Sequence, residues 1–123
     1  MAFLDNRVFD NGLTVLDTEA NAVHVTSQEA TTYAEAITTY TLGVSSSLSI
    51  AAPSDRTGGG RKVTVASIAD GSITGTGTVT HYALVDTTNT RLLATAALTA
   101  SQSVTNGNTF TLATFDIGIP DPT

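Results

Sequence analysis

Short stretches in which apolar and polar residues alternate fill the chain beyond Gly60. In the stretch from Lys62 to Ile68, Val63 and Val65 fall on one side of an extended chain, and Lys62 and Thr64 fall on the other. A period of two is typical of a half-buried β-strand. Such strands, separated by turn residues, predict a mainly β protein: an antiparallel β-sandwich or small barrel with a short N-terminal helix and one further short helical turn.

Turn signals divide this β region. Asp70-Gly71 and Asn106-Gly107 each favour a hairpin between the strands that flank them. Residues 72–86 are expected to form one long strand or two short ones, with Gly75 and Gly77 marking a bulge or a bend. A turn at residues 87–90 then precedes a strand over 91–98. In the long strand one side is expected to carry Val79, His81, Ala83 and Val85, and the other Tyr82 and Leu84.

The last strand, residues 108–120, changes its apolar side partway along. Phe110 and Leu112 fall on one face, whereas Phe115, Ile117 and Ile119 have the opposite parity. A β-bulge near Ala113-Thr114 would let both sets point inward. Alternatively, both faces of this strand are covered.

The N-terminal region predicts a helical arm. Phe9, Leu13 and Leu16 recur at the spacing of one helical face, with Asp5 as a candidate cap. Gly12 weakens this helix by about 1 kcal/mol relative to alanine. We therefore expect an arm over residues 1–20 and a single β domain over residues 21–123.

Two further elements are expected before the glycine-rich stretch. In the segment AVHVTS, Val23 and Val25 alternate with His24 and Thr26, which predicts a half-buried strand. Residues 28–37 predict a helical turn, capped by Thr31 or Thr32 and with Glu35 in its first turn. Residues 39–53 are weakly patterned, and residues 53–60 predict a polar loop.

Length and charge exclude several functions. The 123 residues suffice for one domain, and 5 Lys and Arg against 11 Asp and Glu give a net charge of −6,. This charge disfavours binding to nucleic acid or to an anionic membrane. The sequence has no apolar run long enough to span a membrane and no secretory signal, so synthesis in a cytosol is expected. It contains no cysteine, which excludes disulfides and thiolate chemistry,.

The stretch TGGGRK at residues 57–62 raises the question of a phosphate-binding loop. Such a loop must lead into a helix whose N-terminus faces the anion, but here an alternating β pattern follows. We therefore interpret it as a loop that feeds a strand. Arg56, Arg61 and Lys62 gather three of the five cationic side chains, and we expect this patch to dock a carboxylate-bearing surface of a partner.

No catalytic, cofactor or metal site is expected. His24 and His81 stand on separate strands outside any metal-binding pattern, and half-buried sheet histidines are the simpler interpretation. No serine lies in a nucleophile elbow. The aspartates at 70, 86, 116 and 121 fall at expected turns and strand ends but match no calcium loop. The tyrosines at 33, 40 and 82 suggest a sugar platform only weakly, and core or interface packing is the better interpretation.

Several segments together resemble a family of small virion proteins of tailed bacteriophages and prophages. They are FDNGL (Phe9–Leu13), SQEATTYAEA (Ser27–Ala36), GRKVTV (Gly60–Val65), TVTHYALVD (Thr78–Asp86), RLLAT (Arg91–Thr95) and the closing run from VTNGNTFTL to FDIGIPD. The resemblance spans nearly the whole chain. It implies a non-catalytic capsid decoration or cement protein, made in the bacterial cytoplasm and located in the virion.

The resemblance also implies partners. These are the major capsid protein or other virion proteins, together with further copies of this chain, commonly as a trimer. The expected contact residues are Phe3, Leu4, Val8, Phe9, Arg56, Arg61 and Lys62. A part associated with the tail or fibre, or a module that binds a receptor carbohydrate, is the alternative.

Overall fold

The computed structural model describes residues 6–120, with side chains from residue 10 onward. The protein is mainly β and antiparallel, with two short helical segments in its described part, and its curled sheet is compatible with the predicted sandwich or small barrel. Contacts divide the chain into two compact units. The half-barrel unit comprises Ala20–Leu48 and Ile68–Leu112. The terminal unit comprises the described parts of Met1–Glu19, Ser49–Ser67 and Ala113–Thr123. The expected boundary after residue 20 thus falls next to a unit boundary, whereas residues 21–123 are shared between the units.

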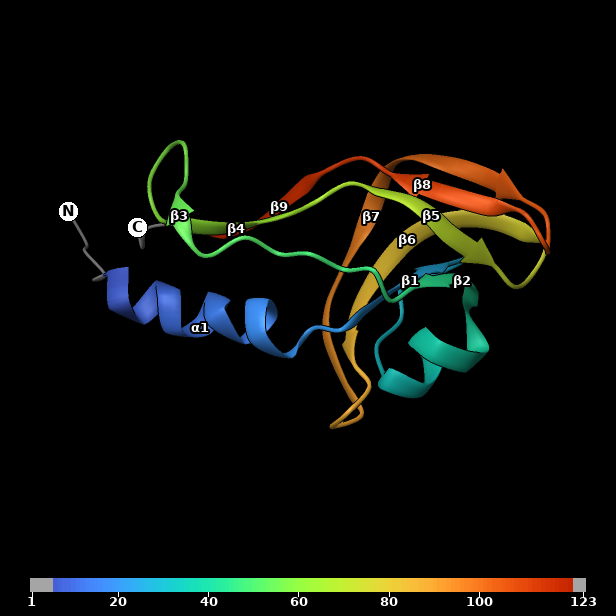
Figure 1. Ribbon diagram of the computed structural model, residues 1–123, viewed down its shortest axis with the longest axis horizontal. Coiled ribbons are helices and arrows are strands. Elements are labelled where there is room, and N and C mark those ends of the chain that lie inside the picture. Colours follow the sequence, from blue (N-terminus) through green and yellow to red (C-terminus); the bar gives the residue numbers. More distant parts are fainter. Residues whose placement is uncertain (1–5, 121–123) are drawn as a thin grey trace. The chain divides into compact units, whose positions relative to one another are not determined.

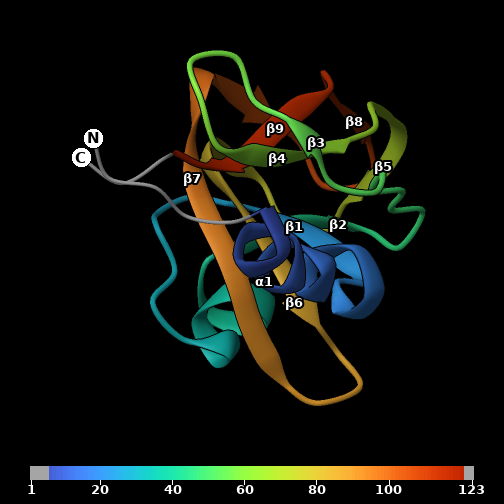
Figure 2. The same cartoon turned by 90° about the vertical axis from the view of Figure 1, so that its left-hand side faces the viewer.

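The half-barrel unit is built on one six-stranded sheet, in the order β7-β6-β1-β2-β5-β8, which curls into a half-barrel (Figures 1 and 2). All its neighbouring strands are antiparallel. The strands are β1 (Ala22–Thr26), β2 (Thr41–Ser45), β5 (Ile68–Ile73), β6 (Gly77–Asp86), β7 (Arg91–Val104) and β8 (Thr109–Leu112). The predicted strands over 22–27 and 91–98 correspond to β1 and the first half of β7, whereas residues 72–86 contain the end of β5 and all of β6.

Strand β1 occupies the middle of this sheet and is buried on both faces. Val23 and Val25 are buried on one face, and Ala22, His24 and Thr26 are buried on the other. The sequence predicted a half-buried strand, which is wrong for β1. An alternating pattern of this kind does not reveal that polar residues such as His24 and Thr26 are themselves covered.

A helical turn covers one face of the half-barrel sheet. It begins at Tyr33 and continues as η1 (Glu35–Thr39), wound as a π-helix. The Glu35 N–H donates to the Thr32 hydroxyl at 3.1 Å, and the Glu35 carboxylate accepts the Thr31 N–H at 2.8 Å. These bonds confirm the predicted cap. The turn belongs to an apolar cluster made of Ala22, Ala30, Ala36, Ala83 and Val85 with Tyr33, Ile37, Tyr40, Val44 and Leu92.

The first hairpin signal is wrong. Asp70 and Gly71 lie inside β5, where the pairing with β8 shifts register between Ile68 and Gly71. A Cβ atom at position 71 would collide with the ring of Phe110, so the glycine is needed for packing and not for a turn. Tertiary contact thereby overrides a local turn preference.

The hairpin predicted at Asn106-Gly107 is confirmed as a turn but not as a pair of neighbouring strands. Gly107 has a φ of 93° and forms a turn after β7, as predicted. The strands that flank this turn are not ladder neighbours, because β7 pairs with β6 and β8 pairs with β5. Instead, the Gly107 N–H donates to the Ile73 carbonyl at 3.0 Å.

The terminal unit combines one helix with a three-stranded antiparallel sheet, in the order β3-β4-β9. Its elements are α1 (Asn6–Glu19), β3 (Ser54–Asp55), β4 (Arg61–Val65) and β9 (Phe115–Ile119). Helix α1 lies against β4, with Leu13 and Leu16 buried as the helical spacing predicts. In β4, Val63 and Val65 are fully buried, which confirms the alternation.

The predicted bulge near Ala113-Thr114 is wrong, because the chain there is not one bulged strand. Strand β8 ends at Leu112 in the six-stranded sheet, and β9 begins at Phe115 in the three-stranded sheet. The change of apolar parity therefore marks a passage between two sheets.

Candidate functional site

The glycine-rich stretch is the loop between β3 and β4. Gly58, Gly59 and Gly60 have φ angles of 91°, 104° and 91°, which side chains rarely allow,. A Cβ at Gly60 would also overlap the backbone of Ile119. Because β4 follows this loop directly, the loop does not lead into a helix, and the interpretation as a loop that feeds a strand is confirmed,.

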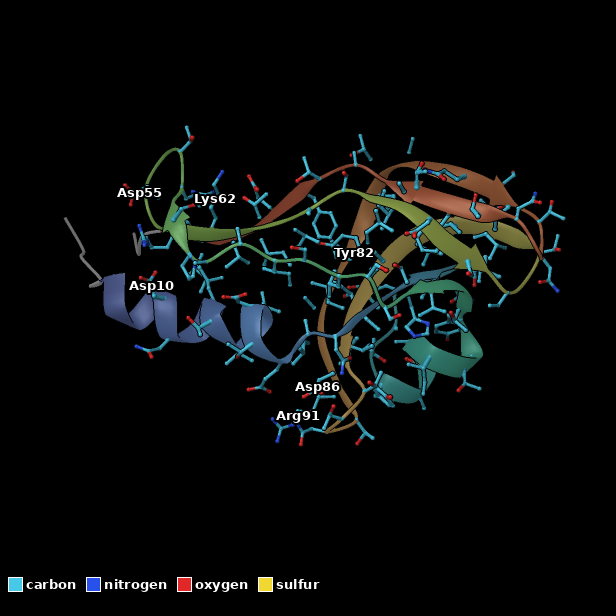
Figure 3. The ribbon with its side chains drawn as sticks, viewed as in Figure 1. Asp10, Asp55, Lys62, Tyr82, Asp86 and Arg91 are labelled. Carbon is cyan, nitrogen blue, oxygen red and sulfur yellow. The ribbon has the colours of Figure 1, made fainter. Side chains whose placement is uncertain are left out.

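Strand β4 sends its two cationic side chains to opposite faces. The guanidinium of Arg61 donates from Nε to Asp10 of α1 at 2.9 Å and from Nη1 to Asp55 of β3 at 2.7 Å. These hydrogen bonds, with the Asp10 bond the largest cause, raise the pKa of Arg61. Figure 3 labels both carboxylates, together with Lys62. The sequence suggested that Arg61 and Lys62 belong to one patch. This prediction is wrong, because the two side chains lie on opposite faces of β4.

Lys62 forms a polar network on the other face of the small sheet. Its Nζ lies 3.0 Å from Oδ2 of Asp116 on β9, and the Thr64 hydroxyl donates to Oδ1 of Asp116 at 2.7 Å. The Thr64 bond first, and Lys62 second, hold the pKa of Asp116 below its usual range. Asp116 was expected at a turn or strand end, and it lies within β9 instead.

Arg56 is the third cation, and its position is fixed by glycine. Its side chain lies across Gly118, where an added Cβ would stand 2.9 Å from the Arg56 Cδ. Its Nη1 donates to the Gly59 carbonyl at 3.0 Å and to the Thr57 carbonyl at 3.5 Å. Among residues 6–120, Arg56 forms no ion pair. Within the described part of the chain no acceptor contacts its remaining N–H groups, which can therefore donate to an external acceptor,.

The cationic side chains of Arg56 and Lys62 border an open pocket in the terminal unit. We call this pocket and its lining residues the basic face. The pocket has a volume of about 380 Å³ and is lined by Arg56, Thr57, Lys62, Asp116 and Gly118. One arginine and one lysine against one aspartate leave it a local charge of +1, in a chain of net charge −6. An arginine held in place beside an ammonium group suits a carboxylate or another oxyanion.

Sequence spacing identified only part of the basic face. Lys62 and Gly118 face each other because β4 and β9 pair in register, although they are distant in the chain. No motif connects these two segments, so Asp116 and Gly118 were missed as parts of the site. Of the four apolar contact residues predicted, Phe3 and Leu4 lie outside the described residues. Val8 and Phe9 belong to α1, but their side chains lie outside the description, so their role stays a prediction.

The histidines lie on the half-barrel sheet. The Nδ1 atom of His24 lies 2.8 Å from the Thr41 hydroxyl, and burial lowers the pKa of this imidazole. His81 lies on β6, where its Nδ1 is 2.8 Å from the Thr80 hydroxyl. Within the described part of the chain, no three His, Asp or Glu side chains gather as metal ligands would.

Asp86 organises the turn between β6 and β7. Its carboxylate accepts hydrogen bonds from the Thr88 N–H at 3.0 Å, the Asn89 N–H at 3.3 Å and the Asn89 side-chain amide at 2.8 Å. The amide bond is the largest cause that holds the pKa of Asp86 below its usual range. Arg91 lies beside Asp86 at the same turn (Figure 3). The turn role predicted for Asp86 is confirmed, whereas Asp70 lies within β5 and Asp121 is outside the described residues.

The tyrosines form no shared platform. Tyr33 and Tyr40 pack against the apolar cluster beside η1. Tyr82 is only 8% exposed, and burial raises the pKa of its hydroxyl. Core packing therefore accounts for Tyr82, whereas Tyr33 and Tyr40 are only partly buried against the cluster.

Among the described residues, no helix has the length and apolar character needed to cross a membrane. Comparison of the chain with models of protein families, with curated proteins and with solved structures finds no match in any of the three.

Proposed function

We propose that this chain is a structural virion protein of a tailed bacteriophage, which decorates the capsid and stabilises its shell through protein contacts. The sequence segments that resemble small virion proteins support this proposal. The structural observation that carries it is the basic face, where Arg56 is fixed in an otherwise acidic chain without an ion pair among residues 6–120. The proposed role is non-catalytic, and the partner is the major capsid protein.

In this role, a carboxylate on the shell occupies the pocket and accepts hydrogen bonds from Arg56. The Gly118 contact and the Gly59 hydrogen bond limit the rotamers of Arg56, so little side-chain entropy is lost on binding,. A hydrogen bond to a charged group contributes about 1.5–3 kcal/mol. Each copy adds one modest interface, and many copies on one shell oppose its expansion together.

Co-sedimentation with undecorated phage capsids tests the proposal. The wild-type protein should bind at a fixed number of copies per shell. Arg56→Ala should weaken binding by roughly 10- to 100-fold, the equivalent of one lost charged hydrogen bond. Arg91→Ala is the matched control, because it removes the same charge from the exposed β6–β7 turn in the other unit.

Two outcomes would count against this function. Equal binding by the wild type and Arg56→Ala would remove the basic face from the contact. Wild-type protein that ignores shells but sediments with isolated tails would favour the tail-associated alternative.

A further inference from the structure

The two edge strands of the half-barrel sheet come from one uncharged stretch of chain. From Leu92 to Phe115 the sequence contains no Asp, Glu, Lys, Arg or His, although the whole chain has 16 charged residues, 5 basic and 11 acidic. This stretch supplies all of β8 and all of β7 after Arg91. The two strands lie at opposite ends of the strand order, and both are visible in Figure 2.

Edge strands expose backbone N–H and C=O groups, and soluble proteins usually protect them with charges, bulges or short strands. Here neither edge strand carries a charge of its own after Arg91, although the Glu29 carboxylate accepts a hydrogen bond from the Thr95 hydroxyl of β7 at 3.1 Å. Strand β7 has register shifts at Leu93 and over residues 98–101, but Ala94–Ala97 pair regularly with β6 and leave four residues of undistorted outer edge. Strand β8, Thr109–Leu112, also offers four residues. The small side chains of Ala94, Thr95, Ala96 and Ala97 allow another strand to approach closely.

The direction of the strands decides how these edges fit. The sheet contains six strands, and every neighbouring pair is antiparallel, so β7 and β8 run in opposite directions. If a second copy continues the sheet, its β8 meets β7 of the first copy in antiparallel orientation, the geometry with the better hydrogen bonds. One such interface covers both kinds of edge at once.

We propose that copies of this chain assemble by pairing Ala94–Ala97 of one copy with the β8 edge of the next, and that these head-to-tail contacts close into a ring. Two chains of net charge −6 repel each other, and an approach through strands whose own residues are uncharged limits this repulsion, because Glu29 beside Thr95 then meets a β8 strand without acidic residues,. A contact between two different edges is heterologous, and a heterologous contact that closes gives a cyclic oligomer.

This inference adds a defined interface to the proposed function and does not depend on it. A ring that forms through β7 and β8 but does not bind capsid shells would contradict the proposed function and support the interface. A protein that binds shells but is monomeric in solution would contradict the interface and support the function.

Two matched variants test the interface. Ala97 on β7 and Thr111 on β8 are both exposed, and Ala97→Glu and Thr111→Glu bring the chain to the same net charge of −7. Native mass spectrometry of the wild type should show one closed oligomer, whereas each variant alone should be monomeric. Circular dichroism and thermal melting check that both variants remain folded.

Mixing the two variants gives the sharpest result. Ala97→Glu keeps an intact β8 edge and Thr111→Glu keeps an intact β7 edge, so an equimolar mixture should form a one-to-one heterodimer and nothing larger. Amide hydrogen exchange of the wild type should show Ala94–Ala97 at least tenfold more protected in the oligomer than at a dilution that dissociates it.

Other results would overturn the proposal. A wild-type protein that stays monomeric at high concentration would contradict it. A Thr111→Glu variant that still forms the wild-type oligomer would also contradict it, because β7 would then pair with β7 of another copy. A mixture that yields no heterodimer would exclude the β7–β8 contact. If a variant is unfolded, unchanged exchange of Ala94–Ala97 across wild-type concentrations would overturn it by itself.

Discussion

The Arg61 Nε atom lies 2.9 Å from Oδ1 of Asp10, although the two residues are 51 positions apart in the chain. This bond joins β4 to α1 inside the terminal unit. A second bond from Nη2 of Arg61 to Oδ2 of Asp10, at 3.2 Å, completes a two-point contact between guanidinium and carboxylate,. The pair thereby adds a polar contact between α1 and β4 to the packing of the buried Leu13 and Leu16.

We expect Asp10→Ala and Arg61→Ala each to lower the melting temperature, and the double variant to lose less than the sum of the two. Residues that share a hydrogen-bonded ion pair are energetically coupled. Thermal melting of all four proteins in a double-mutant cycle measures the coupling. Asp10→Ala combined with Lys62→Ala is the control and should be additive, because Lys62 contacts Asp116 on the other face of β4.

Leu13→Ala should lower the free energy of unfolding by about 2–5 kcal/mol, the range for removing a buried leucine side chain. Leu13 is only 2% exposed, whereas Val15 on the same helix is 37% exposed. Val15→Ala should therefore change stability by no more than about 0.5 kcal/mol. Urea denaturation compares the two variants, and equal losses would contradict the orientation of α1.

Gly71→Ala should destabilise the protein by about 1–3 kcal/mol, the cost of overpacking a closely packed site. The added Cβ would meet the buried ring of Phe110. Gly12→Ala is the opposite case, since among the described side chains its Cβ would meet only the Ile119 Cδ1, at 3.8 Å. We expect that variant to be more stable by up to about 1 kcal/mol from helix propensity. A Gly71→Ala variant as stable as the wild type would show that β5 and β8 are packed differently.

The Asp86 carboxylate should make stability depend on acid pH. Its pKa in the fold is depressed below the unfolded value of about 3.9, so its contribution is fully present above that value and is lost as pH falls through the folded pKa,. The stability difference between the wild type and Asp86→Ala should therefore be constant near neutral pH and shrink below about pH 4. Chemical denaturation between pH 2 and 7 measures it, and a difference that grows toward acid pH would contradict the hydrogen bonds at this turn.

Sequence periodicity identified the elements whose pattern is local. The spacing of Leu13 and Leu16 predicted α1, and the alternation of Val63 and Val65 predicted β4, because each pattern repeats within a few residues. The cap formed by Thr32 and Glu35 was also visible, since both partners lie in one helical turn. By contrast, β2 was missed. Gly43 interrupts its apolar pattern, and only the close approach of Ser72 and Val25 explains why a glycine stands there.

Non-local contacts account for the errors. Asp70-Gly71 carries a strong turn preference, yet packing under Phe110 places it within a strand. The parity change at Ala113-Thr114 was visible, but a bulge and a passage between sheets produce the same pattern. The sequence pattern alone does not distinguish a bulge from a passage between sheets. The passage occurs because β9 pairs with β4 in the three-stranded sheet.

The sequence by itself determined that this chain is a mainly antiparallel β protein with a short N-terminal helix, because alternation, helical spacing and turn residues act over a few positions. It also determined that the chain is acidic and that Leu92–Phe115 is uncharged. Only the tertiary structure decided that Arg61 is neutralised by Asp10 while Arg56 lies over Gly118, and that the uncharged stretch forms both edges of one sheet. Strand pairing brings distant segments together, and neither composition nor spacing specifies which strands become neighbours.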